Sequence, residues 1–206
     1  MRFLLAMAAM LALATCATHE RDNRFVVGSD PKAFVMIGVA EASDSTAAGY
    51  TMMWRRVDPE TGRFEGIGLN NTFEPHTNSN SSIRLHGIPG EFETVQLAPG
   101  TYALDNVYAL IRDHLVSYYA NGSVVGPERP SFEVKAGEAI YLGLWEMRVD
   151  ASTASARLWR MDGDDMRAAA REAHETLGEI QLYEARTISV PCTPHRLNPM
   201  SERQVC

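Results

Sequence analysis

The chain has 206 residues, which is enough for one domain with a sizeable core. It carries 19 Lys and Arg against 26 Asp and Glu, a net charge of −7, and the basic residues form no cluster. This acidic balance argues against a nucleic-acid-binding protein and against electrostatic attraction to anionic lipid. We therefore expect any membrane attachment to depend on covalently bound acyl chains.

Residues 1–15 have the pattern of a signal peptide. Arg2 supplies a minimal positive region, and the apolar run from Phe3 to Ala14 has the length of a signal-peptide core. A spanning helix needs about 20 apolar residues, so this run is too short to remain as an anchor. Leu13-Ala14-Thr15-Cys16 resembles the lipobox, in which signal peptidase II cuts before a lipid-modified cysteine, although Thr15 replaces the usual Gly, Ala or Ser. The alternative is ordinary cleavage after Ala14, which would give a secreted protein without lipid.

The three cysteines fit the lipoprotein interpretation. An odd number would leave one reactive thiol in an oxidising compartment. If Cys16 carries lipid, palmitate among its acyl chains, Cys192 and Cys206 remain as a disulfide pair that closes a 15-residue loop. The alternative is two unpaired thiols on a frayed tail. Their spacing suits no zinc site, and we expect neither a metal nor a cofactor.

The rest of the chain predicts a tether followed by a mostly β domain. Residues 16–31 are mostly polar and without periodicity, which is typical of a flexible tether. Residues 32–161 then contain many short apolar runs separated by turn residues at a spacing of about ten, as in a β-sandwich. The predicted strands are Ala33–Ala40, Tyr50–Val57, Arg63–Leu69, Glu91–Leu97, Thr101–Ile111, Leu115–Ala120, Ser131–Val134, Ala139–Val149 and Ser155–Met161.

Turn chemistry separates these runs. Asp58 to Gly62 predicts a tight turn with Gly62 in the left-handed conformation, and Asn121-Gly122 is a strong hairpin signal. The other predicted turns are Ala98-Pro99-Gly100, Pro127 to Pro130, and Ala136-Gly137. The pattern favours an antiparallel sandwich of about 7–9 strands, transthyretin-like or immunoglobulin-like.

One segment departs from the β pattern. Asp164 and Asp165 precede Met166 to Leu177, where apolar residues recur at helical spacing, and Gly178 follows. This predicts one short helix within residues 162–206, a C-terminal extension that packs on the domain. The acidic cluster from Asp162 to Asp165 lacks the ligand spacing of a calcium loop, so we interpret it as a helix cap and turn.

The middle of the chain is similar to a known family. Leu97-Ala98-Pro99-Gly100-Thr101-Tyr102, followed by Phe132-Glu133-Val134-Lys135-Ala136-Gly137 and Tyr141-Leu142-Gly143, resembles uncharacterised bacterial envelope lipoproteins with a transthyretin-like or prealbumin-like sandwich. The resemblance covers at best Ala33 to Trp159, and its conspicuous residues are structural. It implies a fold and a compartment, and it supplies no catalytic residues.

Two features suggest a binding site. Residues 70–82 form a polar segment, either a binding loop or disorder, in which only Phe73 and His76 could anchor a ligand. Aromatic residues on predicted strands could stack on sugars or pack in the core: Trp54, Tyr118, Tyr119, Trp145 and Trp159. Period-two alignment with Tyr141 and Met147 favours the core for Trp145.

These observations indicate no catalytic constellation, and we do not expect an enzyme. The preferred hypothesis is a non-catalytic, lipid-anchored protein of the bacterial envelope, at the outer membrane facing the periplasm, which interacts with an envelope protein partner. The alternative is a module that binds glycan, such as peptidoglycan, or another ligand. Burial of all three tryptophans would remove the anchors of the glycan hypothesis.

Overall fold

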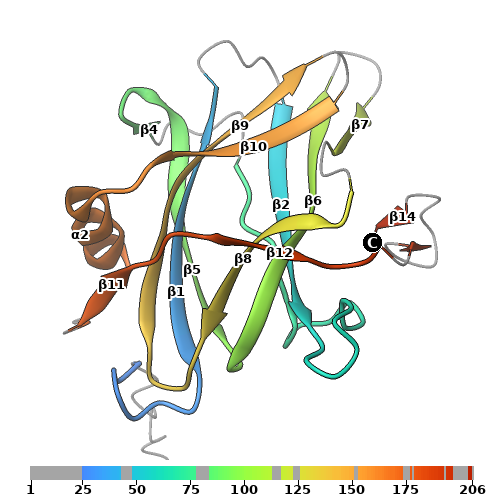
Figure 1. Ribbon diagram of the computed structural model, residues 1–206. Helices are drawn as coiled ribbons and strands as arrows, with labels where there is room; N and C mark the ends of the chain where they lie inside the picture. The colour runs from blue at the N-terminus through green and yellow to red at the C-terminus, as the bar shows by residue number, and fades with distance from the viewer. Residues whose placement is uncertain are drawn as a thin grey trace, which may run out of the picture.

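The computed structural model describes residues 25–42, 48–77, 84–112, 117–122, 126–150, 153–173, 177, 179–192, 194–196 and 204–205 (Figure 1). The signal peptide and Cys16 lie outside these residues. The described chain is mostly β with a single helix, and its two packed sheets form a sandwich-like arrangement. It thereby confirms the expected fold class at the level of a two-sheet β protein.

Sheet A has the strand order β4-β5-β1-β9-β10, and the short strand β11 pairs with the start of β9. Its strands are β1 (Ala33–Glu41), β4 (Arg84–Leu85), β5 (Ile88–Leu97), β9 (Ala139–Asp150), β10 (Thr153–Arg160) and β11 (Ile180–Leu182). Sheet B has the order β3-β2-β6-β8-β12. Its strands are β2 (Ala48–Val57), β3 (Thr72–Phe73), β6 (Gly100–Arg112), β8 (Glu128–Val134) and β12 (Arg186–Ser189).

Strand β7 (Ser117–Gly122) joins the two sheets along one side. It pairs with β6 of sheet B and, through two residue pairs near its end, with β10 of sheet A. A separate small pair is formed by β13 (His195–Arg196) and β14 (Gln204–Val205). The described part of the sandwich is therefore continuous from one sheet to the other on the β7 side.

The pairing is not purely antiparallel, which corrects the prediction. Strand β1 pairs antiparallel with β5 but parallel with β9, and the β7–β10 and β9–β11 pairs are parallel too. Parallel pairing is typical of strands that are covered on both faces, and all nine residues of β1 are buried. A strand covered on both faces fits an interior position, and here β1 lies between β5 and β9.

The core between the sheets is apolar and rich in aromatic rings. Trp54 of β2 makes edge contacts with Trp145 of β9 at 5.7 Å and with Phe132 of β8 at 5.3 Å, measured between ring centroids. Alternate residues of β1, from Ala33 to Val39, point into this core. Their neighbours Phe34 and Met36 point to the other face of sheet A.

Helix α2 (Gly163–Glu172) covers that outer face. Ala169 of the helix packs with Phe34, Met36 and Tyr141, and Figure 1 shows α2 beside β1, β5 and β9. The prediction of one helix in this region is confirmed, but the helix begins three residues before Met166 and ends at Glu172, short of the predicted last turn at Leu177. The predicted stop at Gly178 lies outside the described residues.

The folded domain begins before the predicted boundary at Lys32. The Phe25 side chain is 4% exposed, and its ring lies 5.4 Å from the ring of Phe34. The Gly28 amide donates a hydrogen bond to the carbonyl of Gly137, which fixes residues 25–31 against the turn before β9. These residues are therefore part of the domain and not of the expected flexible tether.

Several predicted turns are confirmed and others are wrong. Gly62 has φ +64°, and a tight turn also occurs at Gly137. Asn121-Gly122 is not a turn, because both residues belong to β7. Pro130 lies within β8, which pairs on one side with β12, and the predicted Arg63–Leu69 strand is reduced to a single bridge between Val57 and Phe64.

A buried acid at the end of β1 makes stability depend on pH. Glu41 is 2% exposed, and its Oε1 atom has no hydrogen-bond partner among the described residues. Burial raises the pKa of Glu41 above its ordinary value of 4.5, while a hydrogen bond with Thr77 and the charge of Arg84 act in the opposite direction. The folded state then binds this proton more tightly than the unfolded chain does, so the contribution of Glu41 to stability falls as the pH rises from about 4.5 through its raised pKa.

We predict that Glu41→Gln increases the free energy of unfolding at pH 7, because it removes a buried charge and keeps an oxygen that can bond Thr77. The advantage of the variant shrinks as the pH falls through the raised pKa of the folded carboxyl toward 4.5, because the wild-type side chain is then protonated. Urea unfolding between pH 4.5 and pH 8 measures this difference. A variant less stable than wild type at every pH contradicts the prediction.

Candidate functional site

The three tryptophans divide into two core residues and one surface residue. Trp54 is fully buried and Trp145 is 4% exposed, whereas Trp159 is 37% exposed on β10. Packing therefore accounts for two of the three. Trp159 is the ring that remains available to a ligand or partner.

A bulge in the β9–β10 pair determines where Trp159 lies. Leu158 pairs with Trp145 and Arg160 pairs with Leu144, so Trp159 lies opposite no residue of the described strand β9. On the other strand, Gly143 has φ +85°, and a Cβ atom there would come within 2.8 Å of the Arg160 carbonyl oxygen. Bulges often redirect a side chain next to a functional site.

A second irregularity, in the β1–β9 pair, corrects the alignment predicted for Trp145. Tyr141 belongs to the outer cluster under α2, while Trp145 belongs to the core between the sheets. The irregularity between these two positions shifts the alternation of β9 by one residue. Trp145 is in the core as expected, but it does not share a face with Tyr141.

His86 lies next to Trp159 at the tip of a two-residue hairpin between β4 and β5. The backbone angle φ is +51° at His86 and +86° at Gly87, and Leu85 pairs with Ile88 across the turn. Positive φ at both central residues is the pattern of a type I′ turn. The His86 ring meets the Trp159 ring edge-on at 5.9 Å between centroids.

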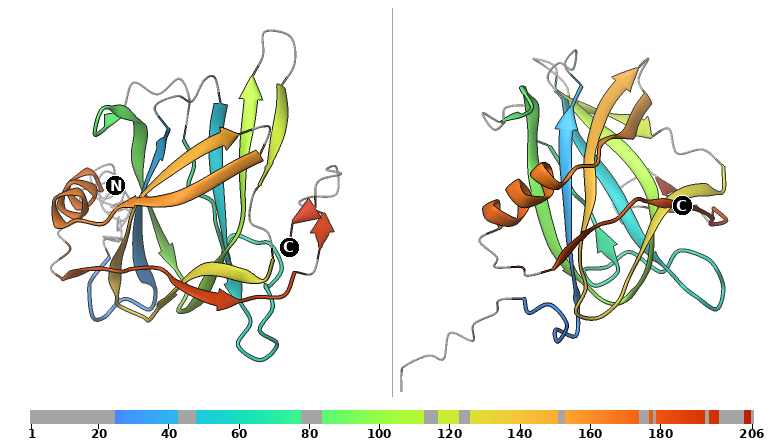
Figure 2. Two further views of the ribbon diagram at one scale, coloured as in Figure 1. Left: turned by 45° about the horizontal axis from the view of Figure 1, so that its top comes forward. Right: turned by 60° about the vertical axis from the view of Figure 1, so that its left-hand side comes forward.

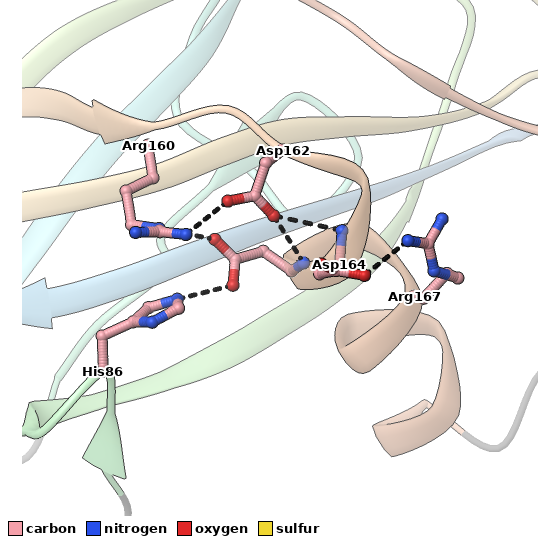
Figure 3. Close-up of polar contacts among 6 residues, drawn as sticks. His86, Arg160, Asp162, Asp164 and Arg167 are labelled. Carbon is pink, nitrogen blue, oxygen red and sulfur yellow. Dashed lines mark hydrogen bonds and ion pairs between the residues drawn. The ribbon is translucent and has the colours of Figure 1, made fainter.

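The first turn of α2 supplies the carboxylates. Asp162 is the N-cap residue, and its Oδ1 atom accepts hydrogen bonds from the backbone amides of Asp164 and Asp165 at 3.1 and 2.9 Å. Its Oδ2 atom pairs with Arg160 Nη2 at 2.5 Å. The acidic cluster is thus a helix cap and turn, as predicted. Figure 3 shows these contacts, together with the neighbouring Asp164–Arg167 ion pair.

Asp165 connects the helix to the hairpin and the strand. Its Oδ1 atom lies 2.6 Å from His86 Nε2, and its Oδ2 atom accepts a hydrogen bond from Arg160 Nε at 3.2 Å. The Asp165 side chain is 7% exposed, while those of His86 and Arg160 are 36% and 39% exposed. A shielded carboxylate therefore holds two accessible side chains in fixed positions. We call Trp159, His86, Arg160, Asp162 and Asp165 the Trp159–His86 patch.

The charges of the patch stabilise one another. The backbone amide of Asp165, followed by Arg160, lowers the pKa of Asp162, and the carboxylates of Asp165 and Asp162 raise the pKa of Arg160. Beneath them, the buried Tyr141 hydroxyl has no hydrogen-bond partner among the described residues. Burial, then the charges of Asp165 and Asp162, raise the pKa of Tyr141 well above its ordinary value, so this phenol stays neutral.

The arrangement is suited to recognition. Because Asp165 occupies Nε2 of His86, the other ring nitrogen is the one left to donate or accept a hydrogen bond. The Trp159 ring provides an apolar surface beside it, and Arg160 provides a fixed cation. An aromatic ring flanked by oriented polar groups can bind a protein side chain or the ring of a sugar.

The residues that we predicted to contact ligand do not form this site. Phe73 is 6% exposed and packs in the core, so it cannot contact a ligand at the surface. His76 is exposed and pairs with Glu93 of β5 at 3.1 Å, away from the Asp165 contact made by His86. The side chains of Tyr118 and Tyr119 lie outside the described residues. Residues 72–77 include β3 and are packed against the domain, unlike the loop expected there.

The Cys192 side chain is disulfide-bonded. Its predicted partner Cys206 and the lipid-attachment residue Cys16 lie outside the described residues. Backbone pairing of His195 with Val205, however, brings the chain segments next to Cys192 and Cys206 together. We therefore retain Cys192–Cys206 as the proposed pairing.

A second polar cluster is structural. Arg55 Nη1 and Asp105 Oδ2 form an ion pair at 3.0 Å, with side chains 2% and 0% exposed, and Arg129 donates to the Asp105 carbonyl at 2.7 Å. The Phe64 ring lies 4.9 Å from the Arg55 guanidinium carbon. These groups are buried under the segment that contains Phe64, so a ligand could reach them only if that segment unfolded. Their role is to fix that segment on the outer face of sheet B.

Comparison of the chain with protein-family models, with curated proteins and with solved structures gives no match. Within the described ranges, no group of three or more His, Cys, Asp or Glu is placed to hold a metal ion. The same ranges contain no helix with the length and apolarity needed to cross a bilayer. Function must therefore be inferred from the geometry of the patch.

We predict that Gly143→Ala lowers the free energy of unfolding by about 3 kcal/mol, from left-handed backbone strain and overpacking against Arg160. Gly126→Ala is the matched control, because Gly126 has φ +84° but nothing within 4 Å of the added Cβ. The control should lose only about 1–2 kcal/mol. Equal losses in denaturant unfolding would contradict the importance of the bulge contact.

Proposed function

We propose that this chain is a non-catalytic lipoprotein of the bacterial envelope, anchored at the outer membrane through Cys16 and facing the periplasm. Its domain, a transthyretin-like sandwich by resemblance, is proposed to serve as an interaction module for an envelope protein. The fixed exposure of Trp159 beside His86 carries the proposal. Tryptophan and arginine are the residue types that most often dominate binding energy at protein interfaces.

The surroundings of Trp159 support a protein partner. Arg157 and Arg160 lie on the same strand, and each is held by a carboxylate, Glu146 for the first and Asp165 for the second. Both arginines are therefore preorganised, which reduces the conformational entropy lost on binding. The aromatic ring, two cations and the His86 edge together make a small surface of mixed chemistry, as at the centre of many interfaces.

Glycan binding is the second candidate function. Its support is the same exposed Trp159 ring, on which the apolar face of a sugar could stack while Arg160 and His86 bond hydroxyl groups. Burial of Trp54 and Trp145 removes the two other aromatic anchors that this hypothesis had. One ring is a smaller platform than an extended polysaccharide such as peptidoglycan normally requires, so the protein partner is preferred.

We predict that Trp159→Ala abolishes capture of the envelope partner by the native, membrane-attached protein after crosslinking. Leu182→Ala is the matched control, since Leu182 is also an exposed apolar residue, 45% against 37% exposed. Partner recovery should fall at least tenfold for Trp159→Ala and stay at the wild-type level for Leu182→Ala, as expected for the loss of about 1.4 kcal/mol or more at a hot spot.

Equal recovery with Trp159→Ala and wild type would contradict the assignment of the patch. Retention by purified peptidoglycan that depends on Trp159, without a captured protein, would replace the preferred function with the glycan alternative. Thermal unfolding of both variants checks that each remains folded.

We predict that the mature wild-type protein begins with an acylated Cys16 and is recovered with membranes. Cys16→Ser removes the thiol that carries the lipid, so the variant should leave the membrane fraction. Mass spectrometry of the N-terminal peptide and membrane fractionation measure both outcomes. A Cys16→Ser protein that remains in the membrane with an unmodified N-terminus would contradict the lipid anchor.

A further inference from the structure

We propose that one end of the sandwich is a membrane-facing end that inserts Leu69 and Ile67 into the surface of a phospholipid bilayer. This inference rests on the proposed lipidation of Cys16 and adds a second contact with the same membrane. The membrane-facing end is defined by Val26, Ile67 and Leu69. The proposed occupant of this surface is a zwitterionic bilayer.

Three of the exposed apolar side chains belong to two segments that lie on opposite sides of this end. Five large hydrophobic side chains are exposed in the described part of the chain: Val26 (57%), Ile67 (38%), Leu69 (100%), Trp159 (37%) and Leu182 (45%). The first three belong to residues 25–31 and to the loop after β2, which lie at the lower end of the molecule in Figure 1 and again in both views of Figure 2. Trp159 and Leu182 belong to β10 and β11.

The loop holds Leu69 outward. The amide of Asn71 donates to the Gly68 carbonyl at 3.1 Å, which closes a turn with Leu69 at its tip. The Gly68 amide donates to Thr72 Oγ1 at 3.2 Å, and the Arg56 amide donates to the Asn71 carbonyl at 2.8 Å, so the turn is tied to β2 and β3. Full exposure of Leu69 is thus a property of a constrained turn.

The path of the chain brings this end to the membrane. Phe25 packs against Phe34 on the outer face of sheet A, and only eight residues, 17–24, separate it from Cys16. At 3.3–3.6 Å per residue they span at most about 30 Å, which is less than the diameter of a domain of this size. A lipid on Cys16 therefore keeps the end that contains residues 25–31 closest to the bilayer.

The acidic charge of the chain favours a zwitterionic bilayer over an anionic one. The turn from Asp58 to Gly62 at the same end carries Asp58 and Glu60, and the pKa of Asp58 is lowered by hydrogen bonds from the backbone amides of Glu60 and Thr61. Asp58 therefore stays ionised in water and limits insertion to the apolar tips. With a net charge of −7, the chain is repelled by anionic headgroups, so a zwitterionic surface is the compatible partner.

The test uses the full lipidated protein reconstituted in phosphatidylcholine vesicles with brominated acyl chains. Leu69→Trp places a fluorophore at the exposed tip, and Leu182→Trp is the matched control on β11. Wild-type protein gives the background of Trp54, Trp145 and Trp159. We expect the added fluorescence at position 69 to shift to shorter wavelength and to be quenched by bromine, and that at position 182 to do neither.

Two failures are distinguishable. Protein that does not float with the vesicles would refute the lipid anchor and, with it, the membrane-facing end. Protein that floats, but with position 69 quenched no more than position 182, would refute the membrane-facing end alone. Because Leu69 is fully exposed, its replacement by Trp leaves no cavity and should not prevent folding.

Discussion

Sheet A must be covered on both faces, and the rest of the structure depends on this constraint. Strand β1 carries apolar side chains toward sheet B and also toward the outside, where Phe34 and Met36 lie. A second sheet can cover only one of these faces. Helix α2 and Phe25 cover the other, which explains why the described chain extends beyond a simple sandwich at both ends.

The same constraint places the candidate site. With α2 fixed on the outer face of sheet A, the N-terminal turn of the helix lies beside the end of β10 and the β4–β5 hairpin. Asp162 caps the N-terminus of the helix, and Asp165 in its first turn binds Arg160 and His86. The polar contacts at the start of the helix therefore also orient the patch. The bulge in the β9–β10 pair, where Gly143 approaches Arg160, then leaves Trp159 unpaired at the edge of the patch.

Local chemistry allowed part of this structure to be predicted from the sequence. The continuous apolar run of β1 indicated a strand covered on both faces, and the spacing of apolar residues after Asp165 indicated the helix. Contacts between residues that are far apart in the sequence could not be predicted from local patterns. His86 and Asp165 are 79 positions apart, and the parallel pairing of β1 with β9 follows from the whole topology. The bulge at Trp159 was also invisible to a strict period of two, although Gly143 was a local sign of it, as the His86-Gly87 pair was of the β4–β5 turn.

The proposed interaction requires that Trp159 contact the envelope protein partner. Site-specific photocrosslinking in intact cells measures this contact directly, with a photoreactive amino acid placed at position 159 or, for comparison, at position 182. We expect one discrete protein adduct from position 159 and none from position 182. No protein adduct from position 159, or the same adducts from both positions, would contradict it.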